Sequence, residues 1–196
     1  YWVTKGRAAE LLEHPIGEKG TAFPELLQQL EAYVDKDGLN ATSGKHMAYI
    51  PAGGLYTGAL GDFLAAATNR YAGVFFANPG AVRMENMVIR WMRDMVGFPE
   101  QAAGNLASGG SIASLTALVT ARDAHQLKGR DFDRTVVYLT DQTHHAIHKA
   151  LRIAGLGEVI HRVIPMDDHF RMQPAALEAQ LRADQEQGLY PWLLVG

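Results

Sequence analysis

The second half of this chain alternates between helical and strand-like patterns, and that alternation restricts its possible folds more than any other feature. Short apolar runs such as Val136-Val137-Tyr138-Leu139 have the pattern of buried strands, and the stretches between them carry helical spacing. The expected elements are a helix from about 110 to 126, a strand at 135–140, a helix at 143–154, a strand at 159–164, a helix at 174–187 and a strand at 192–195. Strands that alternate with helices favour a parallel sheet. The chain is therefore predicted to be an α/β protein whose strand-end loops, 140–144 and 165–169, gather at one edge of the sheet.

The tract Ser108-Gly109-Gly110-Ser111, which opens the first of these helices, predicts an anion site. Gly109 and Gly110 let the backbone approach a ligand closely. The first N–H groups of a helix have no partners within the helix, so a helix start of this kind suits a phosphate group. The same tract also fits a capped helix that binds nothing, because Ser108 and Ser111 are good capping residues.

Histidines cluster directly after the first predicted strand. His144, His145 and His148 follow the strand end in the run Asp141-Gln142-Thr143-His144-His145-Ala146-Ile147-His148. The carboxyl ends of parallel strands are where open α/β sheets bind ligands, and an imidazole offers a flat face for an aromatic ring. A single histidine is more often structural, but three of them at this location favour a site.

The first half of the chain is predicted to be helical and interrupted by loops. Thr21 is expected to cap a first helix with Pro24 in its first turn, and Asp37-Gly38 to end it. A second helix is expected over 60–71. A third carries Met84, Met87, Trp91 and Met95 at helical spacing, which favours core packing over a cofactor site. Asn78-Pro79-Gly80 is expected to form the turn before this third helix.

Taken together, these motifs resemble those of the pyridoxal-phosphate-dependent group II amino-acid decarboxylases, the family of the aromatic-L-amino-acid and glutamate decarboxylases. Three blocks carry the resemblance, and their order and spacing match over roughly residues 20 to 196. The blocks are His46-Met47-Ala48-Tyr49-Ile50-Pro51-Ala52-Gly53-Gly54 with its continuations at 60–66 and 76–85, the tract 108–114, and Asp141-Gln142-Thr143-His144.

The resemblance implies a fold-type I large domain that binds pyridoxal 5'-phosphate. Gly109, Gly110 and Ser111 would then hold the phosphate, and His144 would stack on the pyridine ring and assist proton handling as the catalytic residue. Tyr49, Ile50 and Pro51 match the substrate-side loop. The implied reaction is decarboxylation of an aromatic or acidic L-amino acid to the amine. Ile50 departs from the aromatic decarboxylases, where a phenylalanine is common, so the substrate itself stays open.

The resemblance also implies a division of the chain and a dimer. Residues 1–58 correspond to an N-terminal arm with the substrate-side loop, and residues 59–196 to the first part of the cofactor-binding domain. Relatives are homodimers whose arms cross to the partner. The family's Schiff-base lysine and its pyridine-nitrogen aspartate lie further along the chain, and Lys149 is expected to face solvent. We therefore expect these 196 residues to be one piece of an enzyme, inactive by itself and with an N-terminus that is incomplete or processed.

Composition excludes several other classes of protein. The chain is 47% hydrophobic and 20% charged, which is ordinary for a globular enzyme. Its net charge of -3 and its lack of a basic block argue against a nucleic-acid partner. It has no cysteine, and no apolar run approaches a membrane span, so we expect neither disulfides nor a membrane partner. No signal-peptide pattern opens the sequence, which favours a cytoplasmic location.

Three alternatives stay open. His144 and His148 could begin a metal site with His161, His169, Asp167 and Asp168, although the sequence contains neither cysteine nor an HExxH motif, and our prediction is that no metal is bound. The chain could be a truncated, non-catalytic relative. An aminotransferase or lyase of the same fold is the other possible activity, because a fold alone does not decide the reaction.

Overall fold

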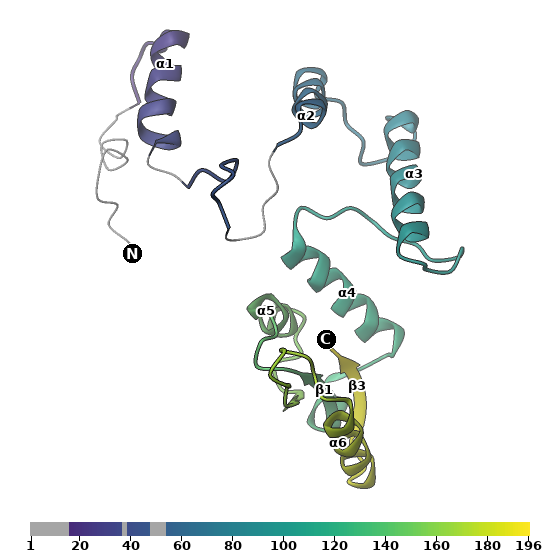
Figure 1. The fold of residues 1–196 in the computed structure, drawn as a ribbon. Helices are drawn as coiled ribbons and strands as arrows, with labels where there is room; N and C mark the ends of the chain where they lie inside the picture. Colours follow the sequence, from purple (N-terminus) through teal and green to yellow (C-terminus); the bar gives the residue numbers. More distant parts are fainter. Residues whose placement is uncertain (1–15, 37–38, 48–53) are drawn as a thin grey trace. The chain divides into compact units, whose positions relative to one another are not determined.

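A computed structural model describes residues 16–36, 39–47 and 54–196 of the chain. The chain divides into two compact units, one up to Gly73 and the other from Val74 onward (Figure 1). Along the chain the elements are α1 (Phe23–Leu30), η2 (Glu31–Asp35), α2 (Tyr56–Thr68), α3 (Pro79–Met95), α4 (Gly110–Ala124), η3 (Gly129–Arg134), β1 (Thr135–Leu139), α5 (His145–Ile153), β2 (Ile160–Val163), α6 (Pro174–Glu186) and β3 (Tyr190–Leu194).

The described part of the first unit contains two α-helices near the places that the sequence predicts, although α2 begins at Tyr56 rather than at residue 60. Helix α1 has a proline in its first turn, as expected, but Ala22 rather than Thr21 is its N-cap and supplies no side-chain bond. The helix continues into the π-helical segment η2, so the apolar stripe runs on to Val34. Helix α2 ends at Thr68, and its C-cap Asn69 adopts a left-handed conformation with φ of 41°. Asparagine tolerates this conformation better than most residues, and it closes the helix earlier than the expected residue 71.

The second unit begins with α3, which starts earlier than its apolar stripe suggests. The Asn78 side chain accepts a hydrogen bond from the Ala81 N–H at 3.2 Å, and Pro79 occupies the first turn. The sequence Asn78-Pro79-Gly80 predicts a turn between helices, but in the structure it forms the capped start of α3 itself. Asparagine and proline favour both structures, one through its side-chain acceptor and the other through its fixed φ.

The sheet is parallel throughout, as predicted, with strand order β2-β1-β3. Strand β1 lies in the centre, and all its residues are buried. Its register pairs Val137 with His161 of β2 on one side, and a bulge between Val136 and Val137 interrupts its pairing with β3 on the other. Pro191 in β3 has no N–H to donate, which fits its place beside this irregularity.

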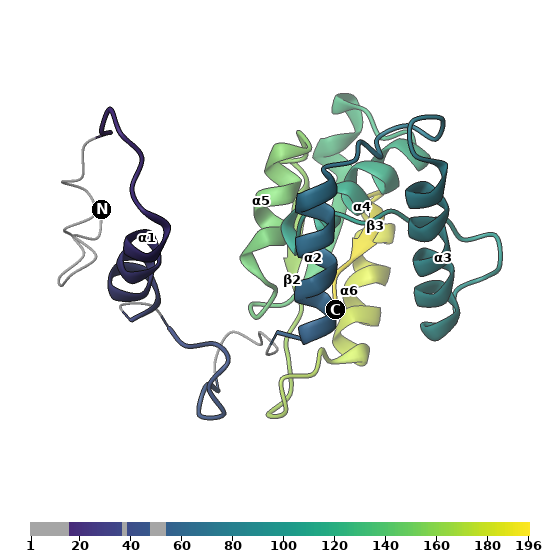
Figure 2. The same ribbon diagram turned by 90° about the horizontal axis from the view of Figure 1, so that it is seen from above.

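Helices cover both faces of the sheet (Figure 2). Val137 and Leu139 point to one face, where they pack with Leu118 of α4 and Leu151 of α5. Val136 and Tyr138 point to the other face, where residues of α6 such as Leu177 and Leu181 lie against them. Successive side chains of a strand alternate between faces, so one central strand supplies both cores. This three-layer arrangement confirms the predicted α/β class.

A buried polar cluster sits within the second of these cores. Asp184 of α6 is fully buried and accepts hydrogen bonds from the Tyr138 hydroxyl at 2.8 Å and the Arg162 Nη2 at 2.8 Å. The Gln180 amide adds a further bond at 3.1 Å. Burial alone raises the pKa of Asp184, but the bonds from Arg162, Tyr138 and Gln180 outweigh it and hold the pKa below its usual value. The cluster joins β1, β2 and α6 through a single carboxylate.

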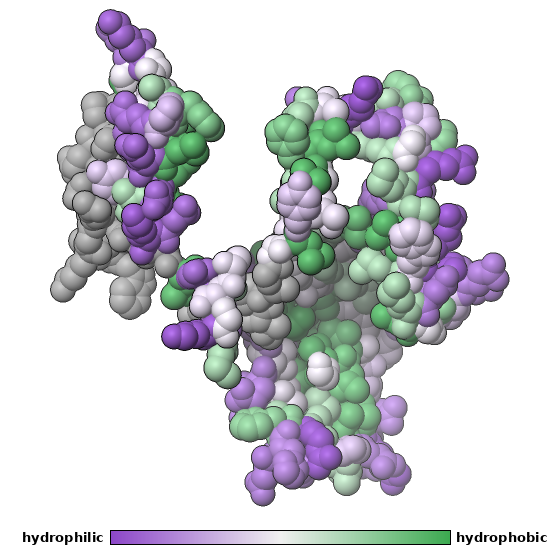
Figure 3. Space-filling view, turned by 45° about the horizontal axis from the view of Figure 1, so that its top comes forward, coloured by the Kyte–Doolittle hydropathy of each residue, from purple (hydrophilic) through white to green (hydrophobic). Residues whose placement is uncertain are grey.

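Apolar side chains remain at the surface over several helices (Figure 3). Met84, Trp91 and Met95 of α3 are 61%, 53% and 82% exposed. The prediction that this stripe packs into a core is therefore wrong for the described residues, because helical spacing identifies an apolar face without identifying what covers it. Within the same residues, no helix is both long and apolar enough to cross a membrane.

Candidate functional site

Two helix starts lie toward the same edge of the sheet. The Arg122 Nη1 donates to the Ala154 carbonyl oxygen at 2.7 Å, which ties the C-terminal end of α4 to that of α5. The C-cap of α4 is His125, and its Nδ1 lies 2.9 Å from the hydroxyl of Tyr190, which is the first residue of β3. Helices α4 and α5 pack against each other, and their C-terminal ends lie where the parallel strands begin. Their N-terminal ends, at Gly110 and His145, therefore point toward the edge where the strands end.

The Gly-Gly-Ser tract forms the start of α4 as the sequence predicts. Gly109 is the N-cap, with φ of 158° and ψ of 169°, a combination that is almost confined to glycine. No side chain caps this helix, so the first-turn N–H groups of Gly110 and Ser111 are left for a ligand or solvent. Gly110 and Ser111 are exposed, and beyond the adjoining residues and the helix's own backbone no atom lies within 4 Å of a Cβ built on Gly109 or Gly110. The backbone is thus uncovered where an anion would bind.

His144 is the N-cap of α5. Its Nδ1 accepts the Ala146 N–H at 3.2 Å, so a neutral ring carries its proton on Nε2. The ring of His145 lies against it, with centroids 4.2 Å apart and planes tilted by 34°. His144 itself is exposed, so its ring remains accessible beyond these contacts. The structure therefore gives His144 a fixed tautomer and one occupied nitrogen.

The two strand-end loops meet, as the parallel sheet requires. Asp141 lines a pocket of about 440 Å³ together with Pro165, Met166, Asp167 and Phe170. Asp167 braces its own loop by accepting hydrogen bonds from the His169 and Arg171 N–H groups at 2.9 and 3.0 Å. The prediction that loops 140–144 and 165–169 share one edge of the sheet is confirmed.

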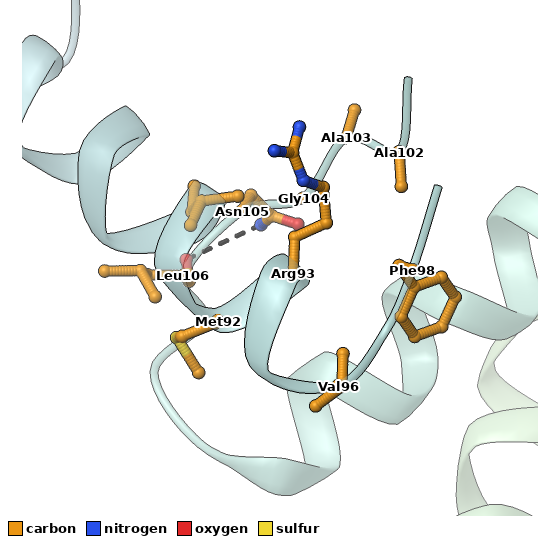
Figure 4. Close-up of a pocket in the computed structure, with 10 residues that line it drawn as sticks. Met92, Arg93, Val96, Phe98, Ala102, Ala103, Gly104, Asn105 and Leu106 are labelled. Atoms are coloured by element: carbon orange, nitrogen blue, oxygen red, sulfur yellow. Dashed lines mark hydrogen bonds between the residues drawn. The ribbon is translucent and has the colours of Figure 1, made fainter. Parts of the chain in front are cut away.

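A second pocket lies between α3 and the segment that leads to the Gly-Gly-Ser tract (Figure 4). Its volume is about 400 Å³, and its lining is mostly apolar, with Met92, Val96, Phe98 and Leu106 among the residues drawn. Arg93 is the charged residue in this lining, and it bonds to Asp94 and to the Glu100 carbonyl oxygen. Sequence reasoning did not find this pocket. The available signal was an arginine one turn before Gly97-Phe98-Pro99, a position that can tie the following loop back to its helix.

The remaining candidates are the predicted substrate-side residues, Lys149, and the histidines of the possible metal site. Tyr49, Ile50 and Pro51, the predicted substrate-side residues, lie outside the described residues. Lys149 is exposed on α5. His148 does not extend the His144 site along the helix: its ring lies 5.5 Å from that of His161 on β2. Across the part of the chain that the structure describes, no three or more histidine, cysteine or acidic side chains converge to hold a metal ion.

Comparisons with known proteins assign the family. Residues 6–196 match the model of the pyridoxal-dependent decarboxylase conserved domain. An aromatic-L-amino-acid decarboxylase of Bacillus atrophaeus is 34% identical over 94% of this chain, and a tyrosine decarboxylase of rice (Oryza sativa subsp. japonica) is 39% identical over 88% of it. The chain belongs to the pyridoxal-dependent decarboxylase family.

Solved structures agree with this assignment. The Oryza sativa TDC, determined with PLP and tryptamine, has a TM-score of 0.80 and is 27% identical over 98% of this chain and 44% of its own. The Rhodiola rosea 4-hydroxyphenylacetaldehyde synthase has a TM-score of 0.82 at 25% identity, covering 98% of this chain and 44% of that one. The fold is thus that of the fold-type I decarboxylases. The chain spans 38% and 34% of the lengths of the two curated relatives named above.

Proposed function

We propose that this chain is the N-terminal part of a pyridoxal-phosphate-dependent decarboxylase that converts an aromatic L-amino acid to its amine. The observation that carries the proposal is the shared sheet edge, toward which both the uncapped start of α4 and the His144 turn point. Membership of the family supports it, and so do the relatives named for aromatic-L-amino-acid and tyrosine decarboxylation. An acidic amino acid is the less supported substrate.

The residues at this edge fit a phosphorylated cofactor. Gly110 and Ser111 present N–H groups with no side-chain cap, and the helix start adds a favourable dipole for an anion. Side chains at 109 and 110 would fill space that is open here. The Ser111 hydroxyl offers one more donor to a phosphate oxygen. These groups would bind the cofactor and orient it, whereas the cofactor itself supplies the reactive chemistry.

His144 would present its ring to the cofactor and a proton to the substrate side. Its Nδ1 is engaged by the Ala146 N–H, so the proton available for transfer is on Nε2. When bound, pyridoxal phosphate supplies an electron sink for the pair left by the departing carboxylate. Exclusion of water from that carboxylate favours loss of its charge, and we assign this role to the side chains of Tyr49, Ile50 and Pro51, as the resemblance implies.

We further propose that the full-length enzyme is a homodimer and lies in the cytoplasm. The exposed apolar side chains of α3 support an interface with further protein, since large exposed apolar patches commonly mark interaction sites. Sedimentation of the full-length enzyme tests the dimer, and fractionation of its source cells tests the location. A species with the mass of one chain would overturn the first, and recovery outside the cytoplasm the second.

Product analysis of the full-length enzyme tests the activity. Loaded with pyridoxal phosphate, it is expected to release carbon dioxide and the corresponding amine from L-tyrosine or L-tryptophan, and less from L-glutamate. A second outcome has specific support, because a phenylacetaldehyde synthase of Arabidopsis thaliana is 28% identical over 98% of this chain. An aldehyde in place of the amine would favour that reaction, and a keto acid without carbon dioxide would favour an aminotransferase.

A further inference from the structure

The turn between β1 and α5 is closed by a reciprocal pair of hydrogen bonds between two threonines. The Thr140 N–H donates to the Thr143 Oγ1 at 3.0 Å, and the Thr143 N–H donates to the Thr140 carbonyl oxygen at 3.1 Å. Both threonines are half-buried, whereas Asp141 and Gln142 between them are exposed. The second bond is that of an ordinary β-turn, but the first depends on a side chain. Thr143 therefore contributes a hydroxyl that the turn type alone does not require.

The residue that carries this hydroxyl, Thr143, directly precedes His144 in the chain. Strand β1 ends at Leu139 and α5 starts at His145, so the whole change of direction occurs between them. The Thr143 hydroxyl fixes the start of the turn, and the bond from Ala146 to the His144 Nδ1 fixes its end. Hydrogen bonds therefore hold the turn on both sides of the His144 backbone, and one of them also engages its ring.

We propose that Thr143 is a positioning residue for His144, acting through its hydroxyl rather than through contact with substrate or cofactor. The proposal rests on the proposed function, because it assumes that the His144 ring has a catalytic task. It also makes a claim about the protein by itself: without the hydroxyl, the Thr140 N–H loses its partner and the turn opens more often. That claim can be measured without any cofactor.

The first readout is hydrogen exchange at the Thr140 amide of the full-length protein without pyridoxal phosphate. Thr143→Val keeps the shape of the side chain and removes the hydroxyl, so we expect exchange at Thr140 to accelerate about tenfold while Val137 in β1 is unchanged. Thr143→Ser is expected to restore slow exchange. Unchanged exchange at Thr140 in the valine variant would overturn the inference, whatever the activity.

The second readout is the division between kcat and KM in the loaded enzyme. A misaligned ring affects the transition state more than binding, so Thr143→Val is expected to lower kcat about tenfold with KM within about twofold, and Thr143→Ser to recover kcat. Thr68→Val in α2 is the matched control, since its hydroxyl donates to the Leu64 carbonyl oxygen on an exposed helix surface. Equal losses in both valine variants would contradict the positioning role.

The two readouts separate this inference from the proposed function. Faster exchange at Thr140 with full activity would show that the turn bond exists but does not position a catalytic ring, and the inference would fail. Faster exchange with reduced kcat and rescue by serine would support it. If the wild-type enzyme shows no decarboxylation, the proposed function fails, and the exchange measurement still decides whether Thr143 holds the turn.

Discussion

Arg122 near the end of α4 donates a hydrogen bond to the carbonyl oxygen of Ala154, the residue that caps the end of α5. The bond joins two helices whose starts carry the two halves of the candidate site, the Gly-Gly-Ser tract and His144. A contact at the far ends of the helices thus helps to set the relation between their near ends. The side chain is 29% exposed, so the bond is only partly screened by solvent.

Arg122→Met should loosen this pair of helices. Methionine keeps the aliphatic stem and loses the guanidinium, so we expect the free energy of unfolding in urea to fall by about 1–2 kcal/mol. Arg152→Met, at an exposed position in the last turn of α5, is the control and should change stability by less than about 0.5 kcal/mol. Equal changes in the two variants would contradict a specific role for the bond between α4 and α5.

Asp184→Asn should cost far more stability than removal of a surface carboxylate. Asparagine leaves Arg162 without its charged partner in a buried cluster, which predicts a loss of about 3 kcal/mol in chemical unfolding. Glu178→Gln removes one partner of an exposed pair with Arg182 and should cost less than about 0.5 kcal/mol. A loss below 1 kcal/mol for Asp184→Asn would mean that the cluster is not a major support of the fold.

The pH dependence of stability follows from the same carboxylate. The folded-state pKa of Asp184 is lowered from the ordinary 3.8, so its contribution is complete above that value and is lost as the pH falls through the folded-state pKa. Unfolding measured below pH 4 should therefore show a weaker acid dependence in Asp184→Asn than in the wild type. Identical acid dependence in the two proteins would assign the acid sensitivity to other groups.

His161 should titrate below an ordinary histidine. Desolvation lowers its pKa first, and the charge of His148 lowers it further. Because the folded state then binds fewer protons than the unfolded state, the stability is highest above pH 6.5, where His161 is neutral in both states, and falls as the pH drops through the folded-state pKa. In histidine-labelled NMR titrations, His148→Ala should raise the pKa of His161, whereas His169→Ala should leave it unchanged. An unchanged pKa in His148→Ala would contradict the coupling.

His144→Ala should reduce turnover far more than cofactor affinity. Loss of one stacking face costs about 0.5–1.5 kcal/mol of binding, whereas general acid–base help contributes roughly 10²–10⁴-fold to rate. His145 touches the His144 ring and so is a poor control, whereas His169 lies on an exposed loop position. Steady-state rates and cofactor titrations of His144→Ala and His169→Ala decide the matter. Near-normal turnover in His144→Ala would end its assignment as a catalytic residue.

Signals within a few residues of sequence predict much of this structure. They fail where the packing partners lie far apart in sequence. The glycine pair, the buried run of β1 and the His144 turn are local signals, and each lies where it was expected. Sequence patterns do not predict the Asp184 cluster, because Tyr138 in β1 and Asp184 in α6 are far apart in sequence and meet only when α6 packs on the sheet. The early start of α3 was missed because Asn78 and Pro79 suit a turn and a helix start equally well.

The central claim is that the start of α4 holds the phosphate of the cofactor beside His144. A crystal structure of the full-length enzyme with pyridoxal phosphate tests it most directly. The account predicts phosphate oxygens about 2.7–3.2 Å from the Gly110 and Ser111 N–H nitrogens, with the His144 ring against the pyridine ring. A phosphate bound elsewhere, with these N–H groups facing solvent, would contradict it.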